Sequence, residues 1–277
     1  MSEGAAQARP RRLPSTWRTL CLVAAVVVAV LALVPPLATQ ARRTEYAAAL
    51  QFSLFALAIP ALVALGAPWR LLRLATTDTP GAPGESGERP RLADRLADRR
   101  RRHRELPWSL AFVAADLGVA IAWHAPGPVS TLGSHGWLAV IEAFALLAFG
   151  LGLWLELVSS PPLEPRSGHL RRVVLAAISM WAFWILAYVT GLSNHGFYHN
   201  FHHAAGGLSA AADQQISSVV LWFVAAAAFI PVIFWNALTW LQSEEDPDTE
   251  LQTLARAERR SGTAPLPPKR GDATPMP

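Results

Sequence analysis

Residues 216–241 read ISSVVLWFVAAAAFIPVIFWNALTWL and contain no Asp, Glu, Lys or Arg. A helix that rises 1.5 Å per residue needs about 20 apolar residues to cross a hydrocarbon core of about 30 Å, so this stretch is long enough to span a membrane. It also lacks the alternation of apolar and polar residues that is typical of membrane β-strands. We therefore predict a transmembrane helix here.

Five more apolar runs of similar length precede this one. The sequence is 52% hydrophobic and only 16% charged, which leaves too little polar surface for a soluble globule. Because backbone amides cannot stay unpaired in lipid, each run must be helical. We predict an all-α integral membrane protein, a bundle of six transmembrane helices, with kinks at Pro60 and Pro231. The first five spans cover about 20–38, 46–67, 108–123, 137–158 and 173–190.

The basic residues indicate which span ends face the cytoplasm, because Lys and Arg are held on that side during insertion. Of the 24 Lys and Arg residues, 22 fall before the first span, in the loop 69–107, between the fourth and fifth spans, or in the C-terminal tail. Both termini are therefore expected in the cytoplasm. The membrane domain, 17–245, is flanked by a basic N-terminal tail, 1–16, and a C-terminal tail, 246–277, whose compositions predict disorder.

The first span allows a second interpretation, because a basic segment followed by an apolar run is also the pattern of a signal peptide. Cleavage would then fall near Ala41. The run reaches full span length, and Pro35 and Pro36 fit poorly in a cleavage site of small residues, so we expect the span to be retained. Cys21, the single cysteine, excludes an intramolecular disulfide and a cysteine-based metal site.

The loop 69–107 is the most basic part of the chain. It opens with Pro-, Gly- and Ser-rich sequence and continues with RLADRLAD at 91–98 and four arginines at 99–102. This order predicts a flexible start and then a short basic helix that lies along anionic lipid headgroups. The alternative is a solvated segment that only enforces the topology. These arginines explain the basic isoelectric point without nucleic acid as a partner.

Two acidic residues, Asp116 and Glu142, fall inside predicted spans. An ionisable group in the hydrocarbon core is costly unless it is paired, hydrated or protonated, which makes each residue a functional candidate. The two carboxyl groups could meet and share a proton or a cation. The alternative is that one of them is a protonated acid that forms a hydrogen bond to a neighbouring helix.

Six of the eight histidines fall at the predicted outer face. In a helical turn, His199, His202 and His203 would lie on one side, at positions i, i+3 and i+4. Neutral imidazoles at that spacing suit copper, zinc or nickel, although cuprous copper usually takes thiolate or thioether ligands, which are not clustered here. The alternative is that these histidines only sit in an aromatic loop at the headgroup boundary.

Several short motifs stand at fixed places along the spans and the outer loop. They are PALVALGAP at 60–68, WHAP at 123–126, Glu142, Tyr198, and ADQQI at 212–216 followed by Leu221 and Trp222. In this order and spacing, from about Trp17 to Glu245, the chain resembles the CtaG-type assembly factors of caa-type cytochrome c oxidase. The resemblance implies a non-enzymatic role in maturing the oxidase, with copper handled at the outer face.

The chain departs from the pattern of similar proteins in two spans. They carry His-x-x-Gln-His in the second span, whereas the equivalent stretch here, 48–52, reads AALQF and keeps only Gln51. Ala139 and Ala143 stand in the fourth span where family members tend to have histidines. The chain is therefore either a divergent member with ligands relocated near His199 to His203 or a member that has lost metal handling.

These observations place the candidate site at the outer face. The expected metal ligands are His124, Glu142, His199, His202, His203 and Asp213, and the further functional candidates are Gln51, Asp116, Pro126, Tyr198 and Gln214. Asp213 has an alternative role, because its carboxylate would also stabilise the positive N-terminal end of the last helix.

The resulting hypothesis is a multi-pass assembly factor in a bacterial plasma membrane, with oxidase subunits as partners, copper as a candidate cargo and no haem. One alternative is a proton-coupled transporter of a small solute that uses Asp116 and Glu142, but the two halves of the chain show no convincing repeat. A haem cytochrome would need histidines facing each other across spans, and none lies mid-span. Motifs of soluble catalysis are absent from the sequence, so we expect no enzymatic activity.

Overall fold

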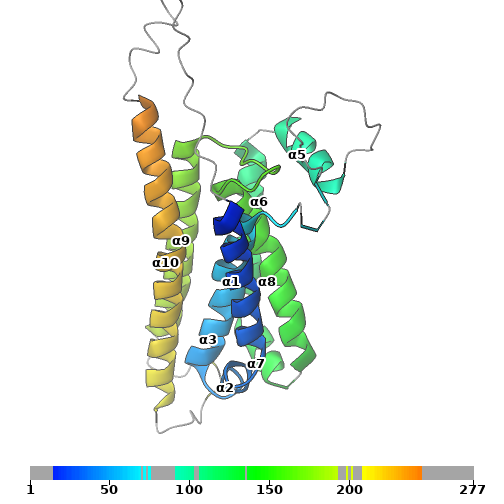
Figure 1. Ribbon diagram of the computed structural model, residues 1–277. Coiled ribbons are helices and arrows are strands. Elements are labelled where there is room, and N and C mark those ends of the chain that lie inside the picture. The colour runs from blue at the N-terminus through cyan, green and yellow to red at the C-terminus, as the bar shows by residue number, and fades with distance from the viewer. Residues whose placement is uncertain are drawn as a thin grey trace, which may run out of the picture. The chain divides into compact units, whose positions relative to one another are not determined.

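The computed structural model describes residues 15–69, 71–72, 74–75, 91–102, 106–134, 136–192, 198, 201 and 208–244. Within them the regular structure is helical, apart from an isolated β-bridge between Ser160 and Leu163 (Figure 1). The chain divides into two compact units, Met1–Ala237 and Leu238–Pro277, and every contact discussed below lies within the first. The all-α prediction is confirmed, whereas most of both predicted tails lies outside the described residues.

Helix α1, Ser15–Leu33, is the first span, and it begins and ends before the predicted 20–38. It ends ahead of Pro35 and Pro36, whose ring nitrogens cannot donate hydrogen bonds to the preceding turn. The chain then turns through the short helix α2, Leu37–Gln40. Val26 and Leu31 of α1 are 62% and 59% exposed, as expected of a helix whose outer face contacts lipid.

The second span consists of three helical segments. Helix α3, Glu45–Ser53, runs into a π-helical turn, η1, Leu54–Ala58, which continues as α4, Ile59–Gly66. Pro60 cannot donate to the carbonyl of Ala56, so the disturbance expected at this proline takes the form of a π-helical turn. The fourth span approaches closely here, because a Cβ atom on Gly150 would lie only 2.7 Å from the Ala56 carbonyl oxygen.

The third span is α6, Leu106–Trp123, close to the predicted 108–123. It is followed by a helix that was not predicted, α7, Pro126–Ser134, at an angle of 62°. Pro126 is the first residue of α7, a position that needs no backbone donor. Among the described residues, five helical stretches are long and apolar enough to cross a membrane on their own, the second being α3–η1–α4, and counting the bent α6–α7 pair as one span gives the predicted six.

The last three spans are α8, Gly136–Leu157, α9, His169–Gly191, and α10, Ala210–Glu244. Their core contains a group of three aromatic rings. Trp154 of α8 stacks on Phe229 of α10 with ring centroids 5.2 Å apart, and Phe229 lies 6.3 Å from Phe183 of α9. Since stacked and tilted rings bury large apolar areas, this group holds the three helices together. Helix α10 continues through Pro231.

The basic loop contains the predicted short helix, α5, Leu92–Arg102. Ala93, Ala97 and Arg100 are buried, whereas Leu92 and Leu96 are exposed. One face of α5 therefore packs against the bundle, and only the other is free to meet headgroups. The Pro-, Gly- and Ser-rich start of this loop lies outside the described residues.

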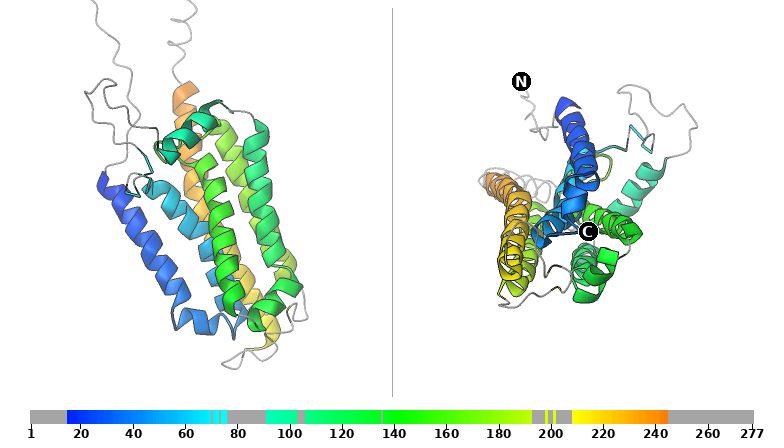
Figure 2. Two further views of the ribbon diagram at one scale, coloured as in Figure 1. Left: turned by 90° about the vertical axis from the view of Figure 1, so that its right-hand side faces the viewer. Right: turned by 90° about the horizontal axis from the view of Figure 1, so that it is seen from below.

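The two ends of the bundle carry different side chains. Figures 1 and 2 place α5 at the end where α1 begins, and α2 and α7 at the opposite end. Arg100 and Arg166 both contact Glu156 at the first end, which we call the arginine end. Helix α4 also ends there, since Gly66 lies against Leu22 of α1.

Candidate functional site

A cavity of about 200 Å³ lies where α3 begins, with walls from α2, α7 and α8 and from Tyr198 and Phe201. We call this end of the bundle the cavity end. Its polar lining consists of Arg42, Glu45, Gln51, His124, Glu142, Tyr198 and Ser217. Four of these, Gln51, His124, Glu142 and Tyr198, are residues that the sequence analysis singled out, and the fold brings them together.

Tyr198 fixes the segment that follows α6. Its hydroxyl donates a hydrogen bond to the His124 carbonyl oxygen at 2.8 Å. The His124 imidazole lies against two aromatic rings, with its centroid 4.8 Å from that of Phe52 and 6.0 Å from that of Tyr198. Burial, and secondly the nearby Glu45 carboxylate, raises the pKa of the Tyr198 phenol, which therefore stays a neutral donor.

Gln51 connects the cavity wall to the end of α1. Its Nε2 donates a hydrogen bond to the Ala32 carbonyl oxygen at 2.7 Å. In a continuous helix that oxygen would accept from residue 36, but Pro36 has no N–H. Gln51 supplies the missing donor and so has a structural role beside any functional one. Gln51 and Glu142 also line a second, small pocket of about 10 Å³, the recess, which shares Phe52 and Ala139 with the cavity lining.

Asp213 and Gln214 join α10 to two other spans. The carboxylate of Asp213 accepts hydrogen bonds from the backbone amides of Glu45 at 2.7 Å and Tyr46 at 3.0 Å, the first two residues of α3. Gln214 Nε2 donates to the carbonyl of Thr190, near the end of α9, at 2.5 Å. Asp213 is fully buried and is not among the residues that line the cavity, whereas His124 and Glu142 are.

The alternative role expected for Asp213 is met in part: Asp213 lies in the first turn of α10, where a negative charge favours the helix N-terminus, but the capping hydrogen bond at that end comes from another residue. Ser209 precedes α10, and its hydroxyl oxygen accepts a hydrogen bond from the Ala212 amide at 3.2 Å. Serine is among the residues preferred at this position. From the first turn of α10, the Asp213 side chain reaches across to α3.

Glu45 is the acidic cavity residue that the sequence analysis missed. It opens α3, is 4% exposed, and lines the cavity together with Ser217, while its Oε1 atom has no hydrogen-bond partner among the described residues. A glutamate in the first turn of a helix is common, because the positive end of the helix dipole favours it. Only the packing of α10 over this turn, which the sequence does not reveal, buries it.

Asp116 lies apart from the cavity. It is 1% exposed in α6, and its Oδ2 atom has no hydrogen-bond partner. Among the described contacts, none joins Asp116 to Glu142. Of these two acids, Glu142 lines the cavity and Asp116 does not. The proton or cation shared by these two acids, on which the transporter alternative depended, therefore has no geometric support.

The three loop histidines, His199, His202 and His203, lie outside the described residues. Their chain neighbours Tyr198 and Phe201 both line the cavity. Within the described part of the chain, no group of three or more His, Cys, Asp or Glu side chains could hold a metal ion. The metal-ligand set therefore stays a prediction.

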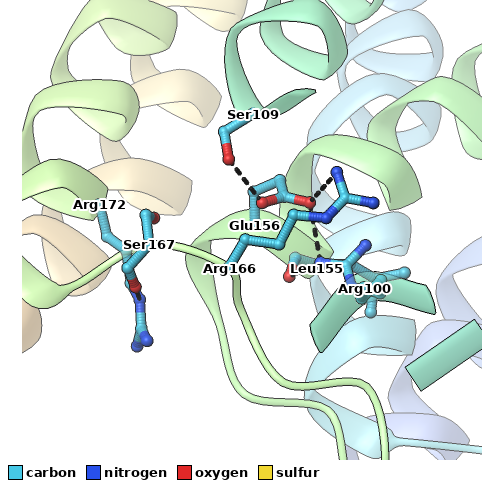
Figure 3. A network of polar contacts seen from close by, with 7 residues as sticks. All are labelled: Arg100, Ser109, Leu155, Glu156, Arg166, Ser167 and Arg172. Carbon is cyan, nitrogen blue, oxygen red and sulfur yellow. Dashed lines mark hydrogen bonds and ion pairs between the residues drawn. The ribbon is translucent and has the colours of Figure 1, made fainter. Parts of the chain in front are cut away.

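A second buried polar cluster, at the arginine end, surrounds Glu156 of α8 (Figure 3). The Glu156 carboxylate is fully buried and accepts hydrogen bonds from Arg100 Nη2 and Ser109 Oγ, both at 2.8 Å, and Arg166 Nη1 lies 3.4 Å away. Arg100 also donates to the Leu155 carbonyl at 2.8 Å. Burial lowers the pKa of Arg100, and the charge of Glu156 opposes that shift.

This cluster attaches α5 to the end of α8. The sequence analysis treated the arginines of the loop as topology and lipid determinants, and it missed Glu156 because a glutamate at a span end normally faces water. The sequence did contain a signal for this cluster. Arg166 follows the span-end acid by ten residues, and the loop carries four consecutive arginines.

These features define a multi-pass helical membrane protein with a polar, aromatic-walled cavity at one end of its bundle and a buried arginine–glutamate cluster at the other. The family model of the cytochrome c oxidase caa3 assembly factor (Caa3_CtaG) matches residues 4–243. The chain therefore belongs to this family, as its motifs predicted. No curated protein and no solved structure matches the chain.

Proposed function

We propose that this chain is a non-enzymatic assembly factor that helps to mature a cytochrome c oxidase in a bacterial plasma membrane. Membership of the caa3 assembly factor family is the observation that carries the proposal. In the proposed orientation both termini are cytoplasmic, because the arginines of α5 and Arg166 gather at one end of the bundle. The cavity then opens to the outer side.

Copper is the proposed cargo of the cavity. Similar proteins carry histidines at the positions of Ala48, Phe52, Ala139 and Ala143, and all four of these residues line the cavity or its recess. The place where the family concentrates imidazoles therefore coincides with the cavity of this chain. Here His124 and Glu142 remain in its wall, and imidazole and carboxylate are ligands that divalent copper accepts.

The loop histidines complete the proposed ligand set. His199 and His202 are the covalent neighbours of Tyr198 and Phe201, which line the cavity beside His124. Because the described part of the chain offers no group of three ligands, metal handling depends on these loop residues. Glu142 and His124 would hold the ion from the bundle, and the loop would supply the remaining imidazoles.

Deletion of the gene tests the proposed function. We expect the deletion strain to lose caa-type oxidase activity, and the oxidase purified from it to contain less copper per haem than the wild-type enzyme. Complementation with the intact chain should restore both quantities. A fully active, copper-replete oxidase in the deletion strain would remove the hypothesis.

We also propose that the outer face of α5 contacts anionic lipids at the arginine end. Leu92, Leu96 and Arg99 share this exposed face at positions i, i+4 and i+7. In native mass spectrometry of the delipidated protein, added phosphatidylglycerol should bind in preference to phosphatidylcholine. Arg99→Gln should reduce that preference, and Arg42→Gln, at the other end of the bundle, should not. Equal binding of both lipids would contradict the proposal.

A further inference from the structure

Glu45 lines the cavity and holds a buried acceptor atom that lacks a hydrogen-bond partner among the described residues. The residue is only 4% exposed and lies in the cavity wall together with Ser217, and the atom without a hydrogen-bond partner is its Oε1. The carboxylate of Asp213 is close enough to interact with it electrostatically. Two backbone amides of α3 donate hydrogen bonds to the Asp213 carboxylate and stabilise its charge. Among the described residues, the side-chain carboxylate of Glu45 has no such pair of donors.

No cation of the described chain compensates Glu45. Arg42 lines the same cavity, but it is exposed and forms no ion pair with Glu45 among the described residues. Arg100, Arg101 and Arg166 pair with Asp98 or Glu156, neither of which lines the cavity. A buried carboxylate without a partner destabilises the protein. Binding of a cation from another molecule next to Glu45 would therefore be favourable.

The cavity has the size of a single side chain. Its volume of about 200 Å³ exceeds the roughly 150 Å³ of an engineered cavity that binds benzene, and it falls below the roughly 300 Å³ at which pockets for drug-sized ligands begin. Phe52, Trp123, Tyr198 and Phe201 supply aromatic walls. Aromatic faces beside a carboxylate suit an ammonium or guanidinium group better than a neutral or an anionic one.

We propose that Glu45, with Ser217 and the aromatic wall, receives one basic side chain, an arginine or a lysine, from a segment of the client protein. The inference rests on the proposed function, which supplies the client. Glu45 precedes Gln51 by six residues, or about 9 Å along α3, so the basic side chain binds nearer the bundle end than the recess that Gln51 shares with Glu142. The client is thereby anchored beside the proposed copper ligands without using them.

Calorimetric titration of the purified full-length chain in detergent tests the recognition step. The probes are N-acetyl-arginine amide, N-acetyl-lysine amide and the uncharged N-acetyl-citrulline amide. We expect at least one basic probe to bind about tenfold or more tightly than the citrulline probe, since hydrogen bonds between charged groups are the stronger ones. Citrulline binding as tight as arginine and lysine binding, or no binding of either basic probe, would overturn the inference.

Matched variants locate the site. Glu45→Gln should abolish the preference for the basic probes, while Glu164→Gln, which changes an exposed acid outside the cavity, should preserve it. An unchanged preference in Glu45→Gln would overturn the assignment. Because the comparison of charged and uncharged probes uses the unmodified chain, the inference stays testable even if the Glu45 variant folds poorly.

Complementation separates this inference from the proposed function. If the deletion strain keeps full oxidase activity, the assembly role fails, whatever the probes do. If the deletion strain loses oxidase activity and the Glu45→Gln chain restores it completely, the assembly role stands and the role of Glu45 in holding the client is refuted. We expect Glu45→Gln to restore only a minor part of the activity, and Glu164→Gln to restore all of it.

Discussion

Asp213 accepts a hydrogen bond from the backbone amide of Glu45 at 2.7 Å, across 168 residues of sequence. The same carboxylate takes the amide of Tyr46, so the start of the second span is capped by a residue from the last. Thr44, which precedes α3, makes no side-chain capping bond. The helix that carries Glu45 and Gln51 into the cavity therefore depends on α10 for its first turn.

Replacement of Asp213 by Ala should destabilise the fold. Loss of a capping side chain costs about 1 to 2 kcal/mol, and here it also leaves the buried Glu45 amide without its acceptor. We expect a lower apparent midpoint of thermal unfolding for the protein in detergent, followed by circular dichroism. Asp98→Ala, at an exposed position of α5, is the control and should leave the midpoint unchanged. Equal midpoints for all three proteins would contradict the capping role.

Two neighbouring arginines of α5 should differ in their contribution to stability. Arg100 forms a buried pair with Glu156, whereas Arg101 forms an exposed pair with Asp98. Removal of one partner of a buried pair costs about 3 to 5 kcal/mol, and an exposed pair contributes at most about 1 kcal/mol. Arg100→Gln should therefore lower the unfolding midpoint clearly more than Arg101→Gln. Similar midpoints would indicate that water reaches the Glu156 cluster.

Proteolysis gives a second measure of the same cluster. If Arg100 and Glu156 hold α5 on α8, limited trypsin digestion of Arg100→Gln should cut the loop 69–107 faster than digestion of Arg101→Gln, although each variant loses one trypsin site. A loop that is cut at the same rate in both variants would show that α5 is held by Ala93 and Ala97 alone.

The spans were predictable because each is a local property of the chain. An apolar run without charges must be helical in lipid wherever its neighbours lie, so residues 216–241 alone identified α10. The π-helical turn ahead of Pro60 and the bent helix α7 were not predicted, since hydropathy reports the length of a run and not its internal hydrogen bonding.

The candidate site was predictable only where a residue type is unusual in its setting. A histidine at a span end and a glutamate inside a span attract notice, and His124 and Glu142 do line one cavity. Glu45 and Glu156 stand at span ends, where acids are ordinary, and only the packing of α10 and α5 buries them. Gln51 was singled out because it matches the family pattern. Its hydrogen bond to the Ala32 carbonyl oxygen has a different cause, since Pro36 has no N–H to donate to that oxygen.

Gly150 should be intolerant of any side chain. A Cβ atom there would lie 2.7 Å from the Ala56 carbonyl oxygen and 2.9 Å from Cγ of Pro60, so α8 would have to move away from the second span. Overpacking of this kind costs about 1 to 3 kcal/mol. Gly150→Ala should lower the unfolding midpoint, whereas Gly118→Ala, with open space around its Cα in α6, should raise it or leave it unchanged. The reverse order would contradict the close approach.

The proposed orientation makes a prediction for reporter fusions. Alkaline phosphatase, which needs export for activity, should be active when fused after Phe201 and inactive when fused after Arg102, because positively charged loops stay in the cytoplasm. Green fluorescent protein at the same two positions should give the opposite pattern. Activity of the phosphatase after Arg102 would place the cavity on the cytoplasmic side and remove the physical basis of the proposed copper delivery.

The loop histidines should decide whether the chain binds metal. The cavity wall offers His124 and Glu142, and no described group contains three ligands, so tight binding of divalent copper requires His199, His202 and His203. We expect the purified chain to bind copper at a defined stoichiometry, and replacement of the three histidines by Ala to abolish most of that binding. His103→Ala, in the basic loop, is the control for non-specific imidazole binding. If the triple variant and the control bind equal amounts of copper, the loop histidines are not the ligands, and the metal site either rests on His124 and Glu142 or does not exist in this chain.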